Sequence, residues 1–454
     1  MELLKRNGQA KHTERVMQFG EGNFLRGFVD WMFDRLNKEY GGDYGVVVVQ
    51  PLPEGLCDKL NEQEGLYSLY LRGLLNGEKT EETRVVDCVT RCINPYQDTD
   101  SFFECAKNPD LRYIVSNTTE AGIEYKSGQN QKDFDSVTFP ARLTMFLKAR
   151  YDAGLDGFIL LPCELIDKNG DNLKKYVLQY AADWEYGNDF EQWINEKNVF
   201  TNTLVDRIVT GYPRDTAKEM ERAYGYLDNM IDTAEIFHLW VIEGDTKYSE
   251  EVPFHKIGLN VIWTDDVAPY KKRKVRILNG AHTMMVLAAR LAGIETVREA
   301  MEDEEIFKFA SKGIFEEIIP TLDLDKKELE AFADDVVERF KNPFIKHYLL
   351  SIALNSVSKF KVRVLPSIME YMKRYNKEPE CLVFSLAALI MFYRTDEAND
   401  DGEVMKFMKT AAIAEILKRV DYWGEDLSCL LPSVEGHINN IELQGIREAM
   451  KAVL

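Results

Sequence analysis

Three residues in the second half of the chain have types and spacing that suit acid–base chemistry on an oxygen atom. The stretch KVRILNGAH contains Lys274, Asn279 and His282, and it leads into AHTMMVLAARLAG, whose apolar residues recur with helical periodicity. On a helix, Asn279 and His282 share a face, whereas Lys274 is turned by roughly 140° at about 100° per residue. We therefore expect Lys274 to lie at or before the first turn and to reach across to the pair.

These residues could transfer a proton to a carbonyl or from an alcohol without a metal. A lysine serves as a general base when desolvation or neighbouring cations lower its pKa, and Lys271, Lys272 and Arg273 are adjacent cations here. The asparagine and the histidine could donate hydrogen bonds to the reacting oxygen, a contribution worth a few kcal/mol. The alternative is a basic loop that leads into a core helix with an internally bonded histidine. A nuclear-localisation role for KKRK is a weaker third interpretation.

A second segment, FGEGNFLRGF at 19–28, suits a dinucleotide. Gly20 and Gly22 follow a predicted strand and open a predicted helix, so the turn is tight and the helix N-terminus can face a pyrophosphate. The third glycine is out of register, because Leu25 stands in its usual place and Gly27 follows two residues later. An ordinary glycine turn is the alternative. The next strand ends in Gln50 instead of Asp or Glu, so these residues do not separate NAD from NADP.

Two further segments combine charged residues with apolar ones. NTLVDRIVTGYP, at 202–213, contains the pair Asp206-Arg207, which is either a plain ion pair or an acid that steers a sugar hydroxyl. Residues 340–366 form either a solvated basic face or a carboxylate pocket, because five cationic or titratable side chains gather there. They are Lys346, His347, Lys359, Lys361 and Arg363.

The patterns around these residues predict two kinds of architecture. The first half alternates strands, expected at 15–20, 44–51, 111–122 and 156–166, with helices such as 22–41, which is typical of a doubly wound, Rossmann-like α/β domain. From about residue 276 the patterns are mostly helical, and the apolar run at 381–393 is expected to be a buried helix. The boundary is expected between 265 and 275. We thus predict a dinucleotide-binding domain at 1–270 and a mainly α-helical substrate domain at 271–454.

Composition limits the possible partners. The 454 residues carry a formal net charge of −20, which argues against general nucleic-acid binding. Seven scattered cysteines without CxxC pairs indicate reduced thiols, with no disulfide framework and no zinc site. No signal peptide or membrane span is expected, so a cytoplasmic location is the simplest interpretation. Oligomeric state is left open.

Taken together, these segments resemble the long-chain polyol dehydrogenase/reductase family, which includes mannitol dehydrogenase and the hexuronate reductases. The family pattern GxGxFxR is matched by Gly20, Gly22, Phe24 and Arg26, and its catalytic signature is matched by Lys274, Asn279 and His282. The resemblance implies an NAD-dependent, metal-free hydride transfer. It places the cofactor at residues of the glycine segment and the third predicted strand: Phe19, Gly20, Glu21, Gly22, Asn23, Phe24, Arg26 and Asn117.

Within the family the likeness is closest to the hexuronate reductases, which implies a sugar-acid substrate. VDRI at 205–208 and SKF at 358–360 match family segments of the substrate pocket, so Asp206 and Lys359 are expected there. Two departures from the mannitol-type pattern, Leu165 and Ser351, put a neutral polyol in doubt. Lys346 and His347 are the expected readers of a carboxylate instead.

Three alternatives accompany this interpretation. A sibling activity, fructuronate reductase or mannitol dehydrogenase, would share the same chemistry. A non-catalytic nucleotide-sensing protein is the alternative of a different class, although the signature Lys274, Asn279 and His282 is intact. A zinc-dependent dehydrogenase ranks last, because six scattered histidines and unclustered cysteines offer no ligand set.

Overall fold

The computed structural model of the chain describes residues 1–118 and 122–454; residues 119–121, which belong to the predicted segment 111–122, lie outside the described residues. The chain divides into two compact units. The first comprises Met1–Arg72 and Thr80–Val267, and the second comprises Gly73–Lys79 and Ala268–Leu454. No helix among the described residues is long and apolar enough to cross a membrane.

The first unit is built on a six-stranded parallel sheet with the order β5-β2-β1-β6-β7-β8. The neighbours β1 and β6 mark the point where the strand order reverses, and ligands of doubly wound sheets bind at the carboxyl ends of such strands. The strands of this sheet are β1 (Glu14–Phe19), β2 (Gly45–Val49), β5 (Val89–Ile93), β6 (Tyr113–Ser116), β7 (Ile159–Pro162) and β8 (Val199–Phe200).

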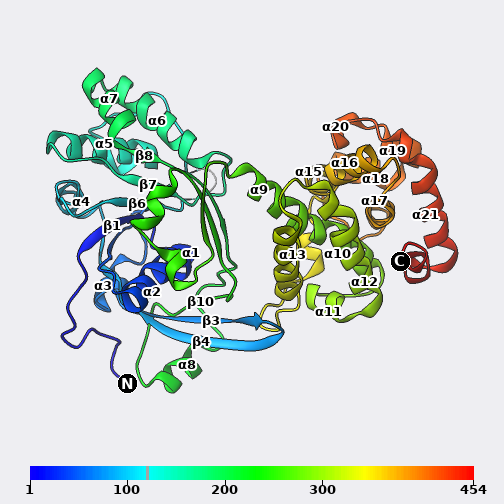
Figure 1. Ribbon diagram of the computed structural model, residues 1–454, viewed down its shortest axis with the longest axis horizontal. Coiled ribbons are helices and arrows are strands. Elements are labelled where there is room, and N and C mark those ends of the chain that lie inside the picture. Colours follow the sequence, from blue (N-terminus) through cyan, green and yellow to red (C-terminus); the bar gives the residue numbers. More distant parts are fainter. Residues whose placement is uncertain (119–121) are drawn as a thin grey trace. The chain divides into compact units, whose positions relative to one another are not determined.

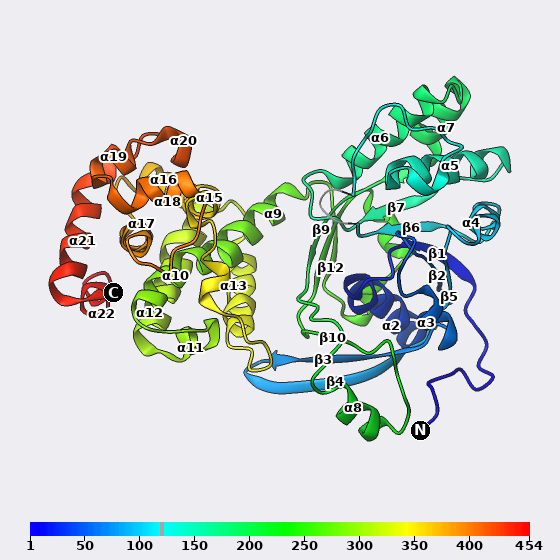
Figure 2. The same cartoon turned by 180° about the vertical axis from the view of Figure 1, so that it is seen from behind.

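Helices cover both faces of this sheet (Figures 1 and 2). Alternate residues of β1 enter separate cores: Val16 packs with the helical segment after β1, whereas Met17 packs with helices on the other face. β2 is buried throughout, as expected for a β-branched strand covered on two sides. The predicted doubly wound fold is therefore confirmed. The helices are α1 (Asn23–Leu25), α2 (Trp31–Tyr40), α3 (Cys57–Glu62), α4 (Thr99–Ala106), α5 (Phe139–Asp152), α6 (Asn169–Asp183), α7 (Asn188–Lys197) and α8 (Ala217–Tyr224).

Two small sheets complete the first unit's strands. One has the order β10-β3-β4, and the other has the order β12-β11-β9, in which β9 runs antiparallel to β11. Their bounds are β3 (Tyr67–Leu75), β4 (Glu78–Val86), β9 (Asn202–Asp206), β10 (Asp232–Ala234), β11 (Leu239–Glu243) and β12 (Val261–Thr264).

The second unit is helical, as predicted (Figure 1). Its centre is α17 (Glu380–Tyr393), the predicted buried apolar helix, which packs against α10 (Gly280–Leu291) and α21 (Leu431–Gln444). The other helices are α9 (Ala268–Lys274), α11 (Val297–Glu302), α12 (Glu304–Lys312), α13 (Lys326–Phe340), α14 (Leu349–Ile352), α15 (Ser356–Arg363), α16 (Leu365–Tyr375), α18 (Gly402–Thr410), α19 (Ile413–Leu417), α20 (Val420–Trp423) and α22 (Ile446–Lys451).

Candidate active site

The glycine turn of the first unit lies at the reversal point of the sheet. Gly20 follows β1 with a backbone φ of +124°, a conformation that side chains disfavour, and its N–H donates to the Val49 carbonyl at 2.9 Å. A Cβ atom on Gly20 would lie 3.6 Å from the Asn117 carbonyl oxygen, so the turn abuts the end of β6. A Cβ atom on Gly22 would meet nothing within 4 Å. The backbone at Gly22 is therefore open to a close approach.

Arg26 fixes this turn from inside. Its side chain is buried, and its Nε donates to the Glu21 carbonyl at 3.1 Å, Nη1 to the Met230 carbonyl at 2.6 Å and Nη2 to Asn23 Oδ1 at 2.6 Å. Phe24, the other side chain of the motif, stacks on Phe28 with the ring centroids 5.0 Å apart. These contacts give Arg26 a positioning role in the loop that carries Glu21 and Asn23.

A buried carboxyl group lies beneath the same turn. Asp30 Oδ2 accepts from Tyr67 Oη at 3.2 Å and from Gln18 Nε2 at 3.4 Å, and the same Nε2 donates to the Gly20 carbonyl at 3.1 Å. Burial raises the pKa of Asp30 to about 7, and burial likewise raises the pKa of Asp232 to about 6. Asp30 therefore titrates near neutral pH, and it does so within the hydrogen bonds that support the turn.

A cavity of about 430 Å³ runs along the carboxyl ends of β1, β2 and β6. Among its lining residues are Phe19, Gln50 and Asn117. The Gln50 amide is held in its own loop, since Nε2 donates to the Leu52 carbonyl at 2.8 Å and Oε1 accepts from the Cys57 N–H at 3.0 Å. Asn117 Nδ2 donates to the Cys163 carbonyl at 2.7 Å. The cavity thus brings together three of the segments expected to contact a dinucleotide.

Two acidic residues of the first unit, Glu164 and Asp206, are buried near strand ends. Glu164, after β7, accepts from Ser116 Oγ at 3.1 Å and from the Thr118 N–H at 3.0 Å, and burial raises its pKa. Asp206 is the last residue of β9 and is 6% exposed. Leu165, one of the departures from the mannitol-type pattern, is 65% exposed.

The signature of the second unit lies on one continuous helix with a π-helical turn in its middle. Lys274 ends α9, the π turn spans Val275–Asn279, and α10 begins at Gly280. The Gly280 N–H donates to the Val275 carbonyl, five residues earlier. Because a π turn closes over five residues, Lys274 and Asn279 are one turn apart and share a face. This differs from the expectation that Lys274 lies at or before the first turn of its helix, because α9 precedes Lys274. The wider π turn also brings Lys274 closer to the face of Asn279 than the roughly 140° separation expected on an α-helix.

His282 extends that face and carries no charge near neutral pH. Burial lowers its pKa well below the usual value, and His347, Arg339 and Arg363 lower it further. Its ring stacks on Phe340, with the ring centroids 4.1 Å apart, and it meets the His347 ring edge to face at 5.3 Å. The buried Nε2 has no hydrogen-bond partner among the described residues. This nitrogen therefore has unused hydrogen-bonding capacity in a buried position.

The three residues of 340–366 that were expected to bind the substrate differ in exposure and in their contacts. His347 contacts His282, but burial lowers its pKa, so it brings no positive charge at neutral pH. Lys346 is exposed, with its ammonium 5.1 Å from the centre of the Tyr348 ring. Lys359 is half-buried, and its Nζ donates to the Ile352 carbonyl at 2.8 Å.

Two arginines lie beside the signature, of which Arg276 was not named from the sequence and Arg363 was named only among the five side chains of 340–366. Arg276 lies in the π turn; burial lowers its pKa to about 10, and its Nη1 is buried without a hydrogen-bond partner among the described residues. Arg363 ends α15, and its Nη1 donates to Thr283 Oγ1 at 3.5 Å. The only sequence signal for Arg363 was its place in the basic segment 340–366.

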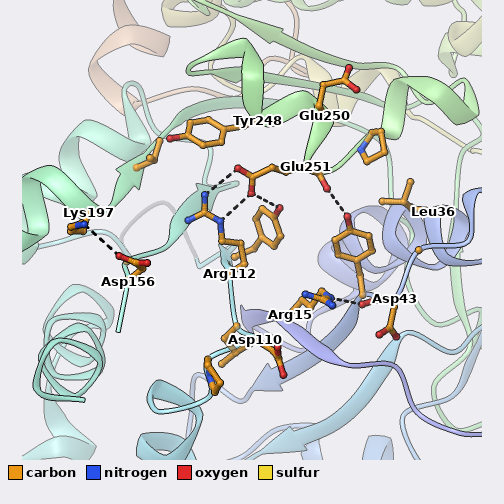
Figure 3. Close-up of a pocket in the computed structure, with 18 of the residues that line it drawn as sticks. Arg15, Leu36, Asp43, Asp110, Arg112, Asp156, Lys197, Tyr248, Glu250 and Glu251 are labelled. Carbon is orange, nitrogen blue, oxygen red and sulfur yellow. Dashed lines mark hydrogen bonds and ion pairs between the residues drawn. The ribbon is translucent and has the colours of Figure 1, made fainter. Parts of the chain in front are cut away.

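A second cavity, of about 960 Å³, is lined by residues such as Arg15, Arg112 and Tyr248 (Figure 3). It is lined at the amino ends of the strands, for example by Tyr113 at the start of β6. Its charges are largely paired: Arg112 contacts Glu251 at 3.1 Å, and Lys197 contacts Asp156 at 3.5 Å (Figure 3). Its size alone therefore does not make it the reactive site. No group of three or more potential metal ligands occurs within 1–118 and 122–454.

Comparisons with known proteins cover both units. Residues 14–256 match the mannitol dehydrogenase Rossmann domain, and residues 266–431 match the mannitol dehydrogenase C-terminal domain. The altronate oxidoreductase of Enterobacter sp. (strain 638) is 44% identical, and that of Escherichia coli O17:K52:H18 (strain UMN026 / ExPEC) is 45% identical; each alignment covers 97% of this chain and 97% of the relative.

Solved structures share the fold. A substrate-free D-sorbitol dehydrogenase superposes with a TM-score of 0.84 at 24% identity, covering 97% of this chain and 95% of that one. The Pseudomonas fluorescens mannitol 2-dehydrogenase, solved with NAD and D-mannitol, gives a TM-score of 0.69 at 22% identity, covering 100% of this chain and 99% of that one. With family matches across both units and relatives at 44–45% identity, the chain belongs to the mannitol dehydrogenase family and is an oxidoreductase.

Proposed function

We propose that the protein interconverts D-tagaturonate and D-altronate, with NAD as the cofactor. The main support for this substrate is the 44–45% identity to altronate oxidoreductases over 97% of both chains. Arg363, which forms no ion pair among the described residues and acts on His282, supports an anionic substrate. The Rossmann match, the open backbone at Gly22 and the cavity beside Gln50 and Asn117 support a dinucleotide.

NAD, when bound, supplies or accepts the hydride at the substrate carbon. Gly20, Gly22 and Asn23 would hold its pyrophosphate at the start of the helix after β1, and Phe19 and Asn117 would flank it at the strand ends. Arg26 and Asp30 keep the glycine turn in shape through the contacts described above.

Lys274 donates the proton to the substrate oxygen during reduction and takes it back during oxidation. Asn279 and the neutral His282 donate hydrogen bonds to the same oxygen, which favours the alkoxide-like transition state by about 3–4 kcal/mol per donor. The π turn supports this assignment because it sets the lysine and the asparagine on one face. Asp206 would bind a substrate hydroxyl, and Lys359 would bind the substrate from α15.

The test follows absorbance of NADH and, separately, NADPH with the purified protein and one of three oxidants. Rapid NADH oxidation with tagaturonate, and slow oxidation with fructuronate and fructose, is the expected result. A preference for fructuronate or fructose would keep the chemistry and replace the substrate. Faster oxidation of NADPH than of NADH would contradict NAD as the cofactor. No turnover with any of the three oxidants would contradict the proposed function.

A further inference from the structure

Cationic side chains outnumber carboxylates in the immediate surroundings of His282. Arg339 and Arg363 both oppose protonation of His282, and a protonated His347 would do the same. Lys359 is affected in the same sense by Arg363 and in the opposite sense by Asp400. In a chain with a net charge of −20, such a concentration of cations favours a local anionic ligand.

Arg363 touches the signature at two points. Its carbonyl oxygen would lie 3.1 Å from a Cβ atom on Gly280, the residue that follows Asn279. Its guanidinium meets Thr283 Oγ1, the residue after His282, at 3.5 Å. Lys359, one turn earlier on α15, is on the same helix face. Arg363 therefore has its backbone beside one end of the Asn279–His282 pair and its side chain beside the other.

The Arg363 guanidinium lacks the carboxylate partner that neighbouring arginines have. In the same unit, Arg273 pairs with Glu328, and Arg290 pairs with Glu397. Among the described residues, no ion pair involves Arg363, and its hydrogen bond to Thr283 is at the limit of length. Partial burial of a guanidinium with unused N–H donors costs free energy unless a ligand accepts hydrogen bonds from them. The planar guanidinium can donate two parallel hydrogen bonds to a carboxylate.

The other candidates fit a carboxylate less well. Arg276 also lacks an ion pair among the described residues, but it lies in the π turn before Asn279, whereas the contacts of Arg363 reach Gly280 and Thr283, the residues that follow the two members of the pair. Lys346 is exposed and lies over Tyr348, and a neutral His347 would offer only a dipole. Lys359 already donates to the Ile352 carbonyl.

We propose that Arg363 binds the substrate's carboxylate and so selects a sugar acid over a neutral ketose. This assignment rests on the proposed function and replaces Lys346 and His347 as the principal carboxylate readers. A carboxylate on Arg363 would leave the reacting oxygen free for Asn279 and His282, since the contacts of Arg363 flank that pair.

The test compares the wild type with Arg363→Gln, Arg363→Lys and Lys361→Gln, using NADH with tagaturonate, fructose or fructose 6-phosphate. Lys361 is a matched control, because it is on the same helix and its Nζ donates to the Asp421 carbonyl, at 3.3 Å, away from Thr283. Arg363→Gln should raise KM for tagaturonate about 10- to 100-fold while leaving kcat/KM for fructose and the NADH Kd unchanged. Arg363→Lys should recover part of this loss, and Lys361→Gln should lose nothing.

Three results would overturn the assignment. These are equal losses for tagaturonate and fructose, a selective loss in Lys346→Gln without one in Arg363→Gln, and wild-type preference for fructose 6-phosphate over tagaturonate. Calorimetry of altronate binding to the enzyme–NAD complex tests the role of Arg363 independently of turnover. Altronate that binds the wild type but not Arg363→Gln supports Arg363 even without turnover, whereas equal binding, or no binding to the wild type, overturns it.

Discussion

At the scale of single residues, the proposed mechanism gives the substrate oxygen one titratable donor, Lys274, and two neutral ones, Asn279 and His282. His282 is neutral because burial lowers its pKa, so it can donate only through whichever ring nitrogen carries hydrogen. Asn279 is neutral at every pH. In the proposed mechanism, the proton that reduction consumes would therefore come from Lys274.

Lys274→Ala tests this division of roles. The change should lower kcat by about 10²- to 10⁴-fold, the usual contribution of a positioned general acid or base, and leave the NADH Kd nearly unchanged. Lys308→Ala is a suitable control, because Lys308 forms an exposed ion pair with Glu304 at 2.6 Å and should retain wild-type turnover. Steady-state kinetics and NADH fluorescence titration provide both values. A parallel loss of NADH affinity in Lys274→Ala would indicate a structural role.

At the scale of elements, the two glycines in the turn between β1 and the following helix differ in backbone conformation and in the space around them. Gly20 has a positive φ, whereas Gly22 has a φ of −65° that any residue adopts. A methyl group at Gly22 would extend into open space. We therefore expect the fold to require glycine at position 20 and the approach of the cofactor to require it at position 22.

Gly22→Ala should leave the melting temperature within about 1 °C and weaken NADH binding at least tenfold, because the added methyl occupies the ligand's approach. Gly20→Ala should lower both the melting temperature and the NADH affinity, since it also imposes a backbone strain of about 1–3 kcal/mol. Differential scanning fluorimetry and NADH titration separate the two effects. Unchanged NADH affinity in Gly22→Ala would show that the cofactor does not approach this backbone.

The carboxyl group beneath the turn should make the first unit's stability depend on pH. Asp30 has a folded pKa of about 7 against an ordinary 3.8, so between these values the folded state keeps a proton that the unfolded state has lost. Stability therefore falls as pH rises through this window, by up to about 1.4 kcal/mol per pH unit. Relative to Asp30→Asn, the wild type should lose about 1 kcal/mol per pH unit from pH 5 to 7.

Urea unfolding at pH 5, 6 and 7, followed by tryptophan fluorescence, measures this slope. Most of the signal comes from the first unit, which contains Trp31, Trp184, Trp193, Trp240 and Trp263. Asp58→Asn, on the exposed side of α3, is the matched control and should follow the wild type. Parallel curves for the wild type and Asp30→Asn would mean that Asp30 is ionised throughout.

Much of the fold could be predicted because its signals are local. The β-branched run of β2 and the apolar period of α10 and α17 are visible in the sequence, and the structure confirms these elements. The hairpin of β3 and β4 went unpredicted although Asn76-Gly77, a typical two-residue turn, connects them. Alternation along β3 was masked by its apolar residues on both faces.

The site was harder to predict because its geometry depends on packing. The spacing of Lys274, Asn279 and His282 identified the signature, but a periodicity of 3.6 could not reveal the π turn that aligns it. Arg363 could not be separated from Lys361 and Lys359 by sequence, because only the fold determines which cation meets Thr283 and which meets the Asp421 carbonyl. Partner choice among neighbouring cations is a tertiary property.

At the scale of the whole molecule, two electrostatic influences on the anionic NADH compete. The net charge of −20 repels it at long range. The cavity at the carboxyl edge adds Glu124 and Asp135 to its lining, and the Arg142 guanidinium there donates to backbone carbonyls, including that of Pro51 at 3.0 Å. Beside Asn23, by contrast, a cavity of about 460 Å³ is lined by cations without a carboxylate: Arg26, Lys59 and Arg214.

The salt dependence of NADH association shows which influence dominates. At 10 mM salt the Debye length is about 30 Å, so an approaching ligand experiences the charge of the whole protein, whereas at 150 mM it is about 8 Å and distant carboxylates are screened. The association rate in stopped-flow fluorescence should therefore rise severalfold from 10 to 150 mM NaCl. Isosmolar sucrose, corrected for viscosity, should leave it unchanged, since it does not screen charge. A rate that falls with salt would mean that Lys59 and Arg214 steer NADH from a distance, and replacing both by glutamine should then abolish the salt effect.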